Sequence, residues 1–430
     1  MFDDSIDSVT ATVDAYNSRG EVEFTLYENG TVGGESVGTF EAPEAGEHFK
    51  KNVEDNKPIP KEDFHAEMAE GGEITLLDAR IGMKRQGFQW KNTQITQLHP
   101  RRLQIDSHNN EPLIGSSVTV EIDLLNAEYL PQPRSEPRDR PMLERDSWQV
   151  NIEPVNNHRN RIDLIQERKQ PVRTSKLIVE QHDNCPPRIH LQRALERIEP
   201  LIRLFAVLQG VLPAPIRASI TTIDGRSPSW RCESWITDYR QSVGCAHTGH
   251  PFPNRSEARV LFNDGYETYL DELDEETFNR AISWYIDALI YGRTVDARMA
   301  SLASGIEQLA EGHRARDKES GKTAHKIKNL IDKLGVEFED LAEFSGTFTD
   351  DALDGSDPNR ISEYFYSKSR NFVLHGDEKV DSQELNLDYE ATLWLFRRIL
   401  VRQFIKAENY ENLDTLSCLS PNRTNAGFTD

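Results

Sequence analysis

The sequence predicts an α+β protein, in which a β-rich N-terminal domain with an embedded helix precedes a C-terminal all-α antiparallel helical bundle. Two observations support this prediction. Residues 1 to about 130 alternate apolar and polar side chains with a period of two, the pattern of half-buried strands. From about residue 270 the apolar residues recur with a helical period. The expected domains are residues 1–270, residues 271–410 and a flexible tail at 411–430.

The N-terminal domain contains several short segments with strand-like patterning. They are residues 21–30, 72–83, 117–125, 147–155, 175–183, 215–225 and 257–264. Residues 131–145 are rich in proline and arginine, which indicates a surface connection that could split this domain into two lobes. Residues 188–210 have helical periodicity and end in Gly210, a common helix terminator.

The C-terminal domain contains longer segments with helical periodicity, joined by short or acidic connections. They are residues 271–293, 295–309, 325–335, 357–376 and 387–410. Within them, Val295, Met299, Leu302, Ile306 and Leu309 form one apolar stripe. Residues 387–410 are apolar around much of the helix circumference, as expected of a central helix. Long helices with short connections predict an antiparallel bundle.

The chain is strongly acidic, with 72 Asp and Glu against 50 Lys and Arg and a net charge of -22. This surface charge favours a protein adapted to high salt, and it disfavours indiscriminate binding of nucleic acid because its field repels phosphate. No apolar run reaches the roughly 20 residues that a membrane span needs. We therefore expect a cytoplasmic protein without a membrane partner.

The four cysteines are too few to form a disulfide scaffold in a chain of 430 residues. Cys245, His247 and His250 are close in sequence and Cys232 lies upstream, so a zinc site is an alternative to an ordinary loop. Structural zinc sites usually contain more closely spaced cysteine pairs. We expect neither a metal nor a cofactor.

Residues 369–376, with the sequence SRNFVLHG, contain an arginine, an amide and a histidine just before a glycine. On an ideal helix Asn371 and His375 are neighbours at i and i+4, whereas Arg370 lies about 140° from His375. Either the helix unwinds before Gly376, or a second copy of the chain supplies the missing partner. The second alternative predicts a composite site at a two-fold axis.

These residue types suit cleavage of RNA without a metal. The imidazole of His375 could transfer a proton near neutral pH, and its charged form is favoured near a helix C-terminus. The guanidinium of Arg370 could stabilise the charge of a pentavalent phosphorus, and the amide of Asn371 could orient the imidazole or a ribose hydroxyl. The alternative is an ordinary helix end with solvated polar residues.

The pattern R-N-x-x-x-H followed by glycine resembles the signature of the HEPN superfamily, and the stretches GIEQLAE and ISWYIDALI resemble its Apea-like branch. The resemblance implies a dimerising helical bundle whose paired motifs form one cleft. It further implies a metal-independent endoribonuclease, acting in antiviral defence or a toxin–antitoxin response. By this resemblance Arg370 and His375 are catalytic, Asn371 supports them, and Glu307 is the acid on an upstream helix. Some members only bind, so a non-catalytic module that binds RNA, nucleotide or a protein partner is the alternative.

A basic segment precedes the motif. Residues 313–333 contain five of the 16 lysines of the chain. Lys322, Lys326 and Lys328 could lead RNA phosphates to the cleft, or they could belong to a solvated helix face. The expected partners are an RNA substrate, a second copy of the chain or a higher homo-oligomer, and a partner protein or small ligand that triggers the N-terminal domain.

Overall fold

A computed structural model describes the parts of the chain that form regular structure and their flanks. The described residues are 5–27, 32–55, 61–68, 72–85, 93–106, 118–127, 141–157, 160–161, 172–183, 185–210, 212–221, 230–233, 255–271, 275–289, 293–317, 323–336 and 382–404. They form two compact units. Unit 1 comprises Met1–Tyr129, Glu144–Arg197 and Ala214–Tyr239, and unit 2 comprises Leu130–Leu143, Ile198–Pro213 and Arg240–Asp430.

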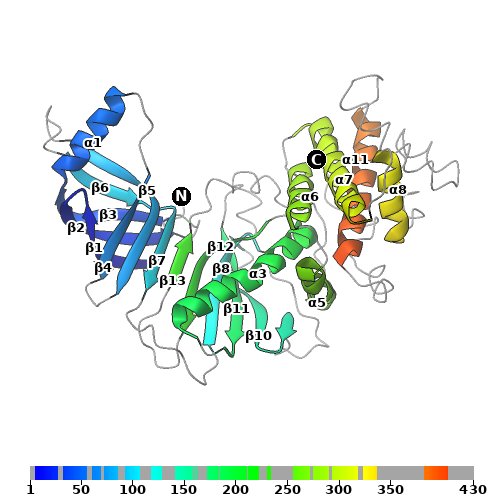
Figure 1. The fold of residues 1–430 in the computed structure, drawn as a ribbon, viewed down its shortest axis with the longest axis horizontal. Helices are drawn as coiled ribbons and strands as arrows, with labels where there is room; N and C mark the ends of the chain where they lie inside the picture. Colours follow the sequence, from blue (N-terminus) through cyan, green and yellow to red (C-terminus); the bar gives the residue numbers. More distant parts are fainter. Residues whose placement is uncertain are drawn as a thin grey trace. The chain divides into compact units, whose positions relative to one another are not determined.

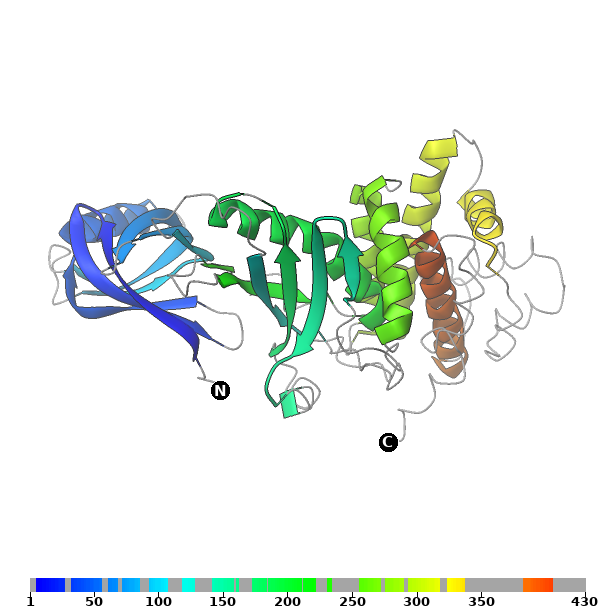
Figure 2. The same cartoon turned by 90° about the horizontal axis from the view of Figure 1, so that it is seen from below.

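The first part of unit 1 is a six-stranded antiparallel barrel (Figures 1 and 2). Its strands are β1 (Ser5–Ala15), β2 (Ser18–Tyr27), β3 (Val32–Glu41), β4 (Glu62–Met68), β5 (Glu73–Arg85) and β6 (Thr93–His99). They pair in the order β4-β1-β2-β3-β6-β5, and pairing between β4 and β5 closes the ring. Helix α1 (Pro43–Glu54) connects β3 to β4. The patterning of the sequence did not predict this helix.

The barrel core follows from the period-two patterning of its strands. In β2, the side chains of Val22, Phe24 and Leu26 are buried, and the residues between them face outward. A two-residue turn at Tyr16 and Asn17, with φ of 50° and 56°, joins β1 to β2. Positive φ at both positions defines the hairpin turn that matches the twist of the strands. The turn and the alternation together fix which face of the hairpin is buried.

The second part of unit 1 continues the same sheet beyond β5. Its strands are β7 (Arg102–Asp106), β13 (Trp230–Glu233), β12 (Ala214–Thr221), β8 (Val118–Leu125), β11 (Arg173–Gln181), β10 (Trp148–Pro154) and β9 (Leu143–Arg145), in this spatial order. The strands expected at residues 117–125, 147–155 and 175–183 are confirmed as β8, β10 and β11.

Helix α3 (Pro187–Gln209) confirms the helix expected at residues 188–210. Its N-terminal half is held against the ends of two strands. The carbonyl of His190 accepts a hydrogen bond of 3.1 Å from the Gln181 side chain, and the Arg197 guanidinium lies over the Trp148 ring. The helix ends at Gly210, whose φ is 68° and whose N–H donates to the carbonyl of Ala206. Glycine adopts this left-handed conformation without steric cost.

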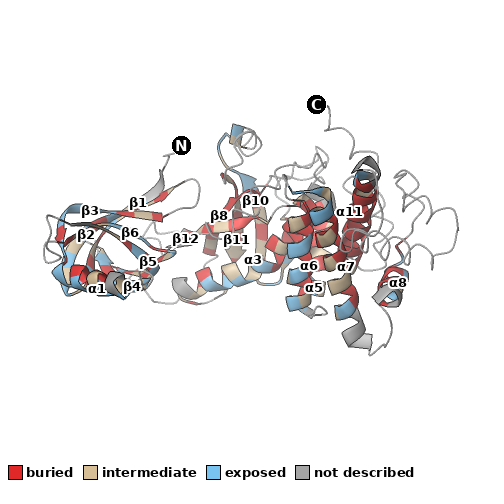
Figure 3. Ribbon diagram, turned by 90° about the horizontal axis from the view of Figure 1, so that it is seen from above, coloured by how far each residue is buried: buried red, intermediate tan, exposed pale blue. Residues whose placement is uncertain are grey.

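The described elements of unit 2, besides the C-terminal part of α3, are helices (Figure 1). They are α5 (Arg255–Asp271), α6 (Glu275–Ala288), α7 (Val295–Asp317), α8 (Thr323–Lys333) and α11 (Ser382–Phe404). Helix α7 contacts α6, α8 and α11, and α11 also contacts α5. Figure 3 shows that α11 is buried over most of its length, as the sequence predicted for a central helix. Within the described residues, no helix combines the length and the apolar character required to cross a membrane.

Four of the five residues predicted to form the apolar stripe on α7, Met299, Leu302, Ile306 and Leu309, are buried, and Val295 at the start of the helix is half-buried. Glycine at position 305 allows close packing on the same helix. A Cβ there would lie 2.3 Å from the Phe396 ring of α11 and 3.1 Å from the Cβ of Trp284 on α6. A larger residue at this position would therefore push three helices apart.

One strand expectation is wrong. Residues 257–264 were expected to be a strand, but they lie in α5. Ala258, Leu261, Phe262 and Tyr269 are buried on one face of that helix at a helical spacing. Eight residues are too few to distinguish the two periods when the apolar run is short. Helix α5, which the sequence analysis placed in the N-terminal domain, belongs to unit 2.

Candidate functional site

The central residues of the expected site lie outside the described part of the chain. Arg370, Asn371, His375 and Lys322 all fall there, as does the helix expected at residues 357–376. The structure describes Glu307, Lys326 and Lys328, together with the helices on either side of the motif in the sequence. The geometry between Arg370 and His375 therefore stays a prediction.

Glu307 lies in the middle of α7, directly after the buried Ile306. Its side chain is half-buried and takes part in a polar or electrostatic contact. Glu311, one helical turn further along α7, forms an ion pair with Lys326 of α8. The stripe of α7 that carries Glu307 and Glu311 thus lies at the border of the α7–α8 contact.

Lys326 and Lys328 are the described members of the three lysines expected to bind RNA, and both have a carboxylate partner. Lys326 is 9% exposed and is neutralised by Glu311. Its burial follows from its position four residues before Leu330, on the side of α8 that packs against α7. Lys328 lies 4.0 Å from Asp332 on the same helix. Neither lysine is without a carboxylate partner, and their proposed contact with RNA stays a prediction.

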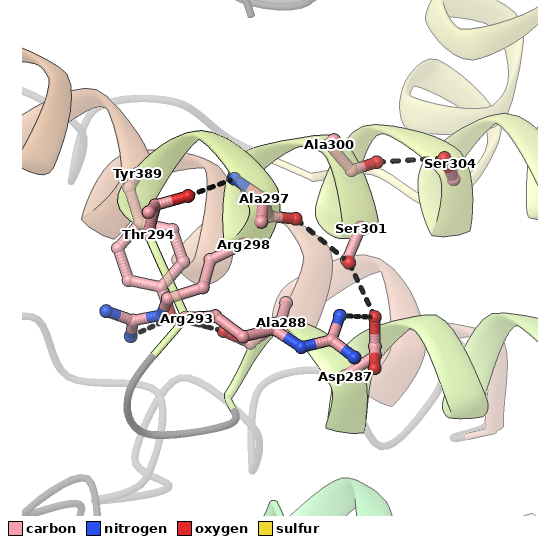
Figure 4. Close-up of polar contacts among 10 residues, drawn as sticks. All are labelled: Asp287, Ala288, Arg293, Thr294, Ala297, Arg298, Ala300, Ser301, Ser304 and Tyr389. Atoms are coloured by element: carbon pink, nitrogen blue, oxygen red, sulfur yellow. Dashed lines mark hydrogen bonds and ion pairs between the residues drawn. The ribbon is translucent and has the colours of Figure 1, made fainter. Parts of the chain in front are cut away.

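A polar cluster joins the end of α6 to the start of α7 and to α11 (Figure 4). The Arg298 guanidinium donates to the carbonyl of Ala288 at 2.9 Å and to the Tyr389 hydroxyl at 2.5 Å. The Tyr389 hydroxyl in turn donates to the same carbonyl at 3.1 Å, and the guanidinium lies 3.9 Å from the ring centroid. Ala288 is the last residue of α6, and the carbonyls at a helix end lack partners within the helix. The cluster therefore caps α6.

The same cluster holds a second acceptor. Asp287 forms an ion pair with Arg293 and accepts a hydrogen bond of 2.8 Å from the Ser301 hydroxyl. Figure 4 shows both donors directed at one oxygen of the carboxylate, with Ser301 pointing down from α7. These contacts fix the connection between α6 and α7. Because the contacts join groups of α6, α7 and their connection to one another, we interpret the cluster as structural.

Glu390, which lies on α11 beside Tyr389, is a candidate that the sequence did not predict. Burial raises the pKa of its carboxyl, and the positive charges of Arg397 and Arg298 only partly oppose that effect. Carboxyls with a raised pKa are candidates for proton transfer, because their protonated form persists closer to neutral pH. The signal in the sequence was a glutamate among the apolar residues of the last long helix.

Arginines of α11 serve the packing of unit 2. Arg397 donates to the Tyr285 hydroxyl of α6 at 2.7 Å. Arg402 donates to the carbonyls of Leu334 and Gly335, where α8 ends. Gly335 has a φ of 58°, a left-handed conformation that glycine often adopts just after a helix. These arginines cross-link helices and are not exposed to a ligand.

Unit 1 contains a separate titratable cluster between β11 and α3. Asp183 contacts Arg197 at 2.8 Å and Arg193 at 3.3 Å. Burial alone would raise the pKa of Asp183, but the hydrogen bond and charge of Arg197, with the charge of Arg193, leave it lowered. Burial raises the pKa of the Cys185 thiol and lowers that of the His190 imidazole. A protonated thiol beside a neutral, fully buried imidazole has no activated nucleophile, so this cluster is structural.

Among the described residues, no group of three or more His, Cys, Asp and Glu side chains is arranged to hold a metal ion. Cys245, His247 and His250 fall outside those residues, and nothing is described of the Cys232 side chain. Comparison of the chain with protein-family models, with curated proteins and with solved structures returns no match.

Proposed function

We propose that the chain is a metal-independent endoribonuclease of the HEPN type, with a composite active site in a homodimer. The observation that carries this proposal is the position of the R-N-x-x-x-H motif. It directly precedes α11, the most deeply buried long helix of a unit whose described elements are helices. We infer that a motif only a few residues before this helix in the sequence has the rigid support nearby that a catalytic group needs.

In this proposal each residue of the motif has one task. His375 transfers the proton of the attacking 2′-hydroxyl or of the leaving 5′-oxygen. Arg370 stabilises the charge that develops on the phosphoryl oxygens. Asn371 orients the imidazole one helical turn away, and Glu307 supports the site from α7. Cleavage of this kind serves antiviral defence or a toxin–antitoxin response.

A mixing experiment tests the composite site. His375→Ala and Arg370→Ala should each lower RNA cleavage by about 100-fold or more, because each removes an acid–base or charge-stabilising group. In a heterodimer of the two variants, one of the two sites would combine an intact Arg370 with an intact His375. Mixing the inactive variants should then restore roughly a quarter of the wild-type rate, since about half the dimers are mixed.

The control is each variant refolded alone at the same total concentration, which should stay inactive. Wild-type cleavage should continue in EDTA, because the proposed chemistry uses side chains alone. Cleavage that persists unchanged in His375→Ala would overturn the proposed enzyme. Inactive variants that stay inactive on mixing would overturn the composite site, with dimerisation of the mixture checked by light scattering.

A further inference from the structure

The barrel contains a segment whose charge is opposite to that of the whole chain. Residues 79–105 have six lysines and arginines and no aspartate or glutamate, in a protein of net charge -22. The segment covers the C-terminal part of β5, all of β6 and the first four residues of β7. It is also rich in glutamine, with five among its 27 residues. A positive region in an acidic protein marks a place where an anion can approach.

The pairing of β5 with β6 collects polar side chains on the outer face of the barrel. Arg80 is opposite His99 and Gly82 is opposite Gln97 in the register. Between them, Ile81 and Leu98 are buried in the barrel, so the alternation directs Arg80, Gln97 and His99 outward, and all three are exposed. Arg101, just after β6, is exposed as well. We call Tyr27, Arg80, Gln97, His99 and Arg101 the β5–β6 face.

Two glycines flatten this face. A Cβ at Gly33 of β3 would lie 3.3 Å from the Tyr27 ring and 3.8 Å from Nδ1 of His99. A Cβ at Gly82 of β5 would lie 2.9 Å from the Cβ of Gln97. The Tyr27 ring and the His99 ring therefore approach each other over a strand position that has no side chain. Glycine in a strand often marks a place where a ligand comes close to the backbone.

The polar groups of the β5–β6 face are largely without protein partners. Within the described part of the chain, neither the guanidinium of Arg80 nor that of Arg101 has a hydrogen bond or ion pair, and the Tyr27 hydroxyl has no hydrogen bond. The described contact on this face is the one between Nε2 of His99 and Oε1 of Gln97, at 3.4 Å. An exposed guanidinium can donate to the phosphate of a nucleotide, and an aromatic ring beside it can stack on the base.

The carboxylates that are opposite β6 in the register lie on the β3 side of the face, and two more, Asp63 and Asp78, lie where β4 pairs with β5. Glu35 of β3 is opposite Gln97, and Glu41 is opposite Gln94. These charges repel phosphate from the β3 side. The cations lie on the β5 side and at the end of β6. A bound strand would therefore place its bases over Tyr27 and His99 and its phosphates toward Arg80 and Arg101.

We propose that the β5–β6 face binds single-stranded RNA, by stacking of bases on Tyr27 and His99 and by phosphate contacts with Arg80 and Arg101. Single strands suit this face because their bases are free to stack, whereas those of a duplex are not. The choice of RNA as ligand rests on the proposed function. The β5–β6 face of unit 1 would then bind the RNA substrate. The basic segment that includes α8 is a weaker candidate for this task, because Lys326 and Lys328 are already paired with carboxylates.

The test measures binding of a fluorescein-labelled 12-nucleotide single-stranded RNA by anisotropy, with the full chain carrying His375→Ala to prevent cleavage. In this background His99→Ala should weaken binding roughly 5- to 100-fold, the range found for loss of one stacked base. Arg80→Gln and Arg101→Gln should each lower the slope of log K against log salt by about 0.7. A duplex RNA of the same sequence should bind more weakly than the single strand.

The matched control is Arg19→Gln. Arg19 is on β2 of the same barrel, exposed and already paired with Glu67 at 2.8 Å, so its removal changes the charge equally without touching the face. Binding and salt slope should then equal those of the background. Thermal unfolding of each variant verifies that the barrel is intact.

The outcomes below test the inference and separate its failure from a failure of the proposed function. No binding of the single strand, equal binding of the duplex, or unchanged binding in His99→Ala and Arg80→Gln would each overturn the inference. If binding is unchanged in His99→Ala and Arg80→Gln but the protein with His375 intact cleaves RNA, the inference fails and the proposed function stands. If the variants lose binding and the protein with His375 intact does not cleave, the face stands and the ribonuclease fails.

Discussion

Two arginines of the helical unit and two arginines of the barrel have opposite environments. In unit 2, Arg397 and Arg402 are buried, and their guanidinium groups donate to a hydroxyl and to backbone carbonyls of neighbouring helices. On the barrel, Arg80 and Arg101 are exposed, and within the described residues their guanidinium groups have no partner. The same residue type therefore cross-links helices in one region and is available to a ligand in the other.

Burial and pairing of the guanidinium distinguish arginines that stabilise the fold from arginines that can bind a ligand. A buried guanidinium that already satisfies carbonyls has little left to offer a phosphate, and its removal leaves buried acceptors unpaired. An exposed, unpaired guanidinium contributes little to folding but keeps all its donors. Stability and ligand affinity should therefore respond in opposite ways to substitutions in the two regions.

The largest effect is expected for Arg402→Met in the helical unit. This change removes the donors to the carbonyls of Leu334 and Gly335 at the end of α8. The free energy of unfolding should fall by about 3 kcal/mol, as for buried acceptors that lose a charged donor. Urea denaturation followed by circular dichroism at 222 nm measures it. A loss comparable to that of an exposed arginine would show that the two regions do not differ.

A smaller effect, with a characteristic pH dependence, is expected for Glu390→Gln. Burial raises the pKa of Glu390 in the folded chain. The folded state thus binds this proton more tightly than the unfolded state does, and stability is lost as the pH rises through the raised pKa. A glutamine is neutral at every pH and avoids this loss. Urea denaturation at pH 7.5 should show a more stable variant than wild type.

The acidic limit provides the control for this prediction. Below the ordinary pKa of glutamate, both the wild-type carboxyl and the glutamine are neutral, so the difference between them should narrow. A difference that stays constant from acidic to neutral pH would mean that the ionised carboxylate carries no cost and that Arg298 and Arg397 fully compensate for burial.

The smallest effect on stability is expected for Arg80→Met on the barrel. Its side chain is exposed, and substitutions at such positions usually change the free energy of unfolding by no more than about 0.5 kcal/mol. The same variant should weaken binding of single-stranded RNA, which Arg402→Met should not do beyond its effect on folding. Denaturation and anisotropy on the same preparations measure both. A marked loss of stability would assign Arg80 a structural role.

Much of the fold was predictable from the sequence. The alternating segments became strands and the apolar stripe from Met299 to Leu309 became the packing face of α7. The helix stop predicted at Gly210 is a position of positive φ. These features depend on local spacing and on single residues, so a short window contains the information. Residues 257–264 were misread because that window was too short to separate the two periods.

The sequence by itself determined the α+β class, the apolar faces of the helices and the candidate motif at Arg370, Asn371 and His375, because each depends on residues that are near one another in the chain. Only the tertiary structure decided that β4 pairs with β5 to close a barrel, that Lys326 is buried against Glu311, and that Tyr27 and His99 meet over Gly33. These contacts join segments from different elements, whose partners are chosen by packing and register rather than by local spacing.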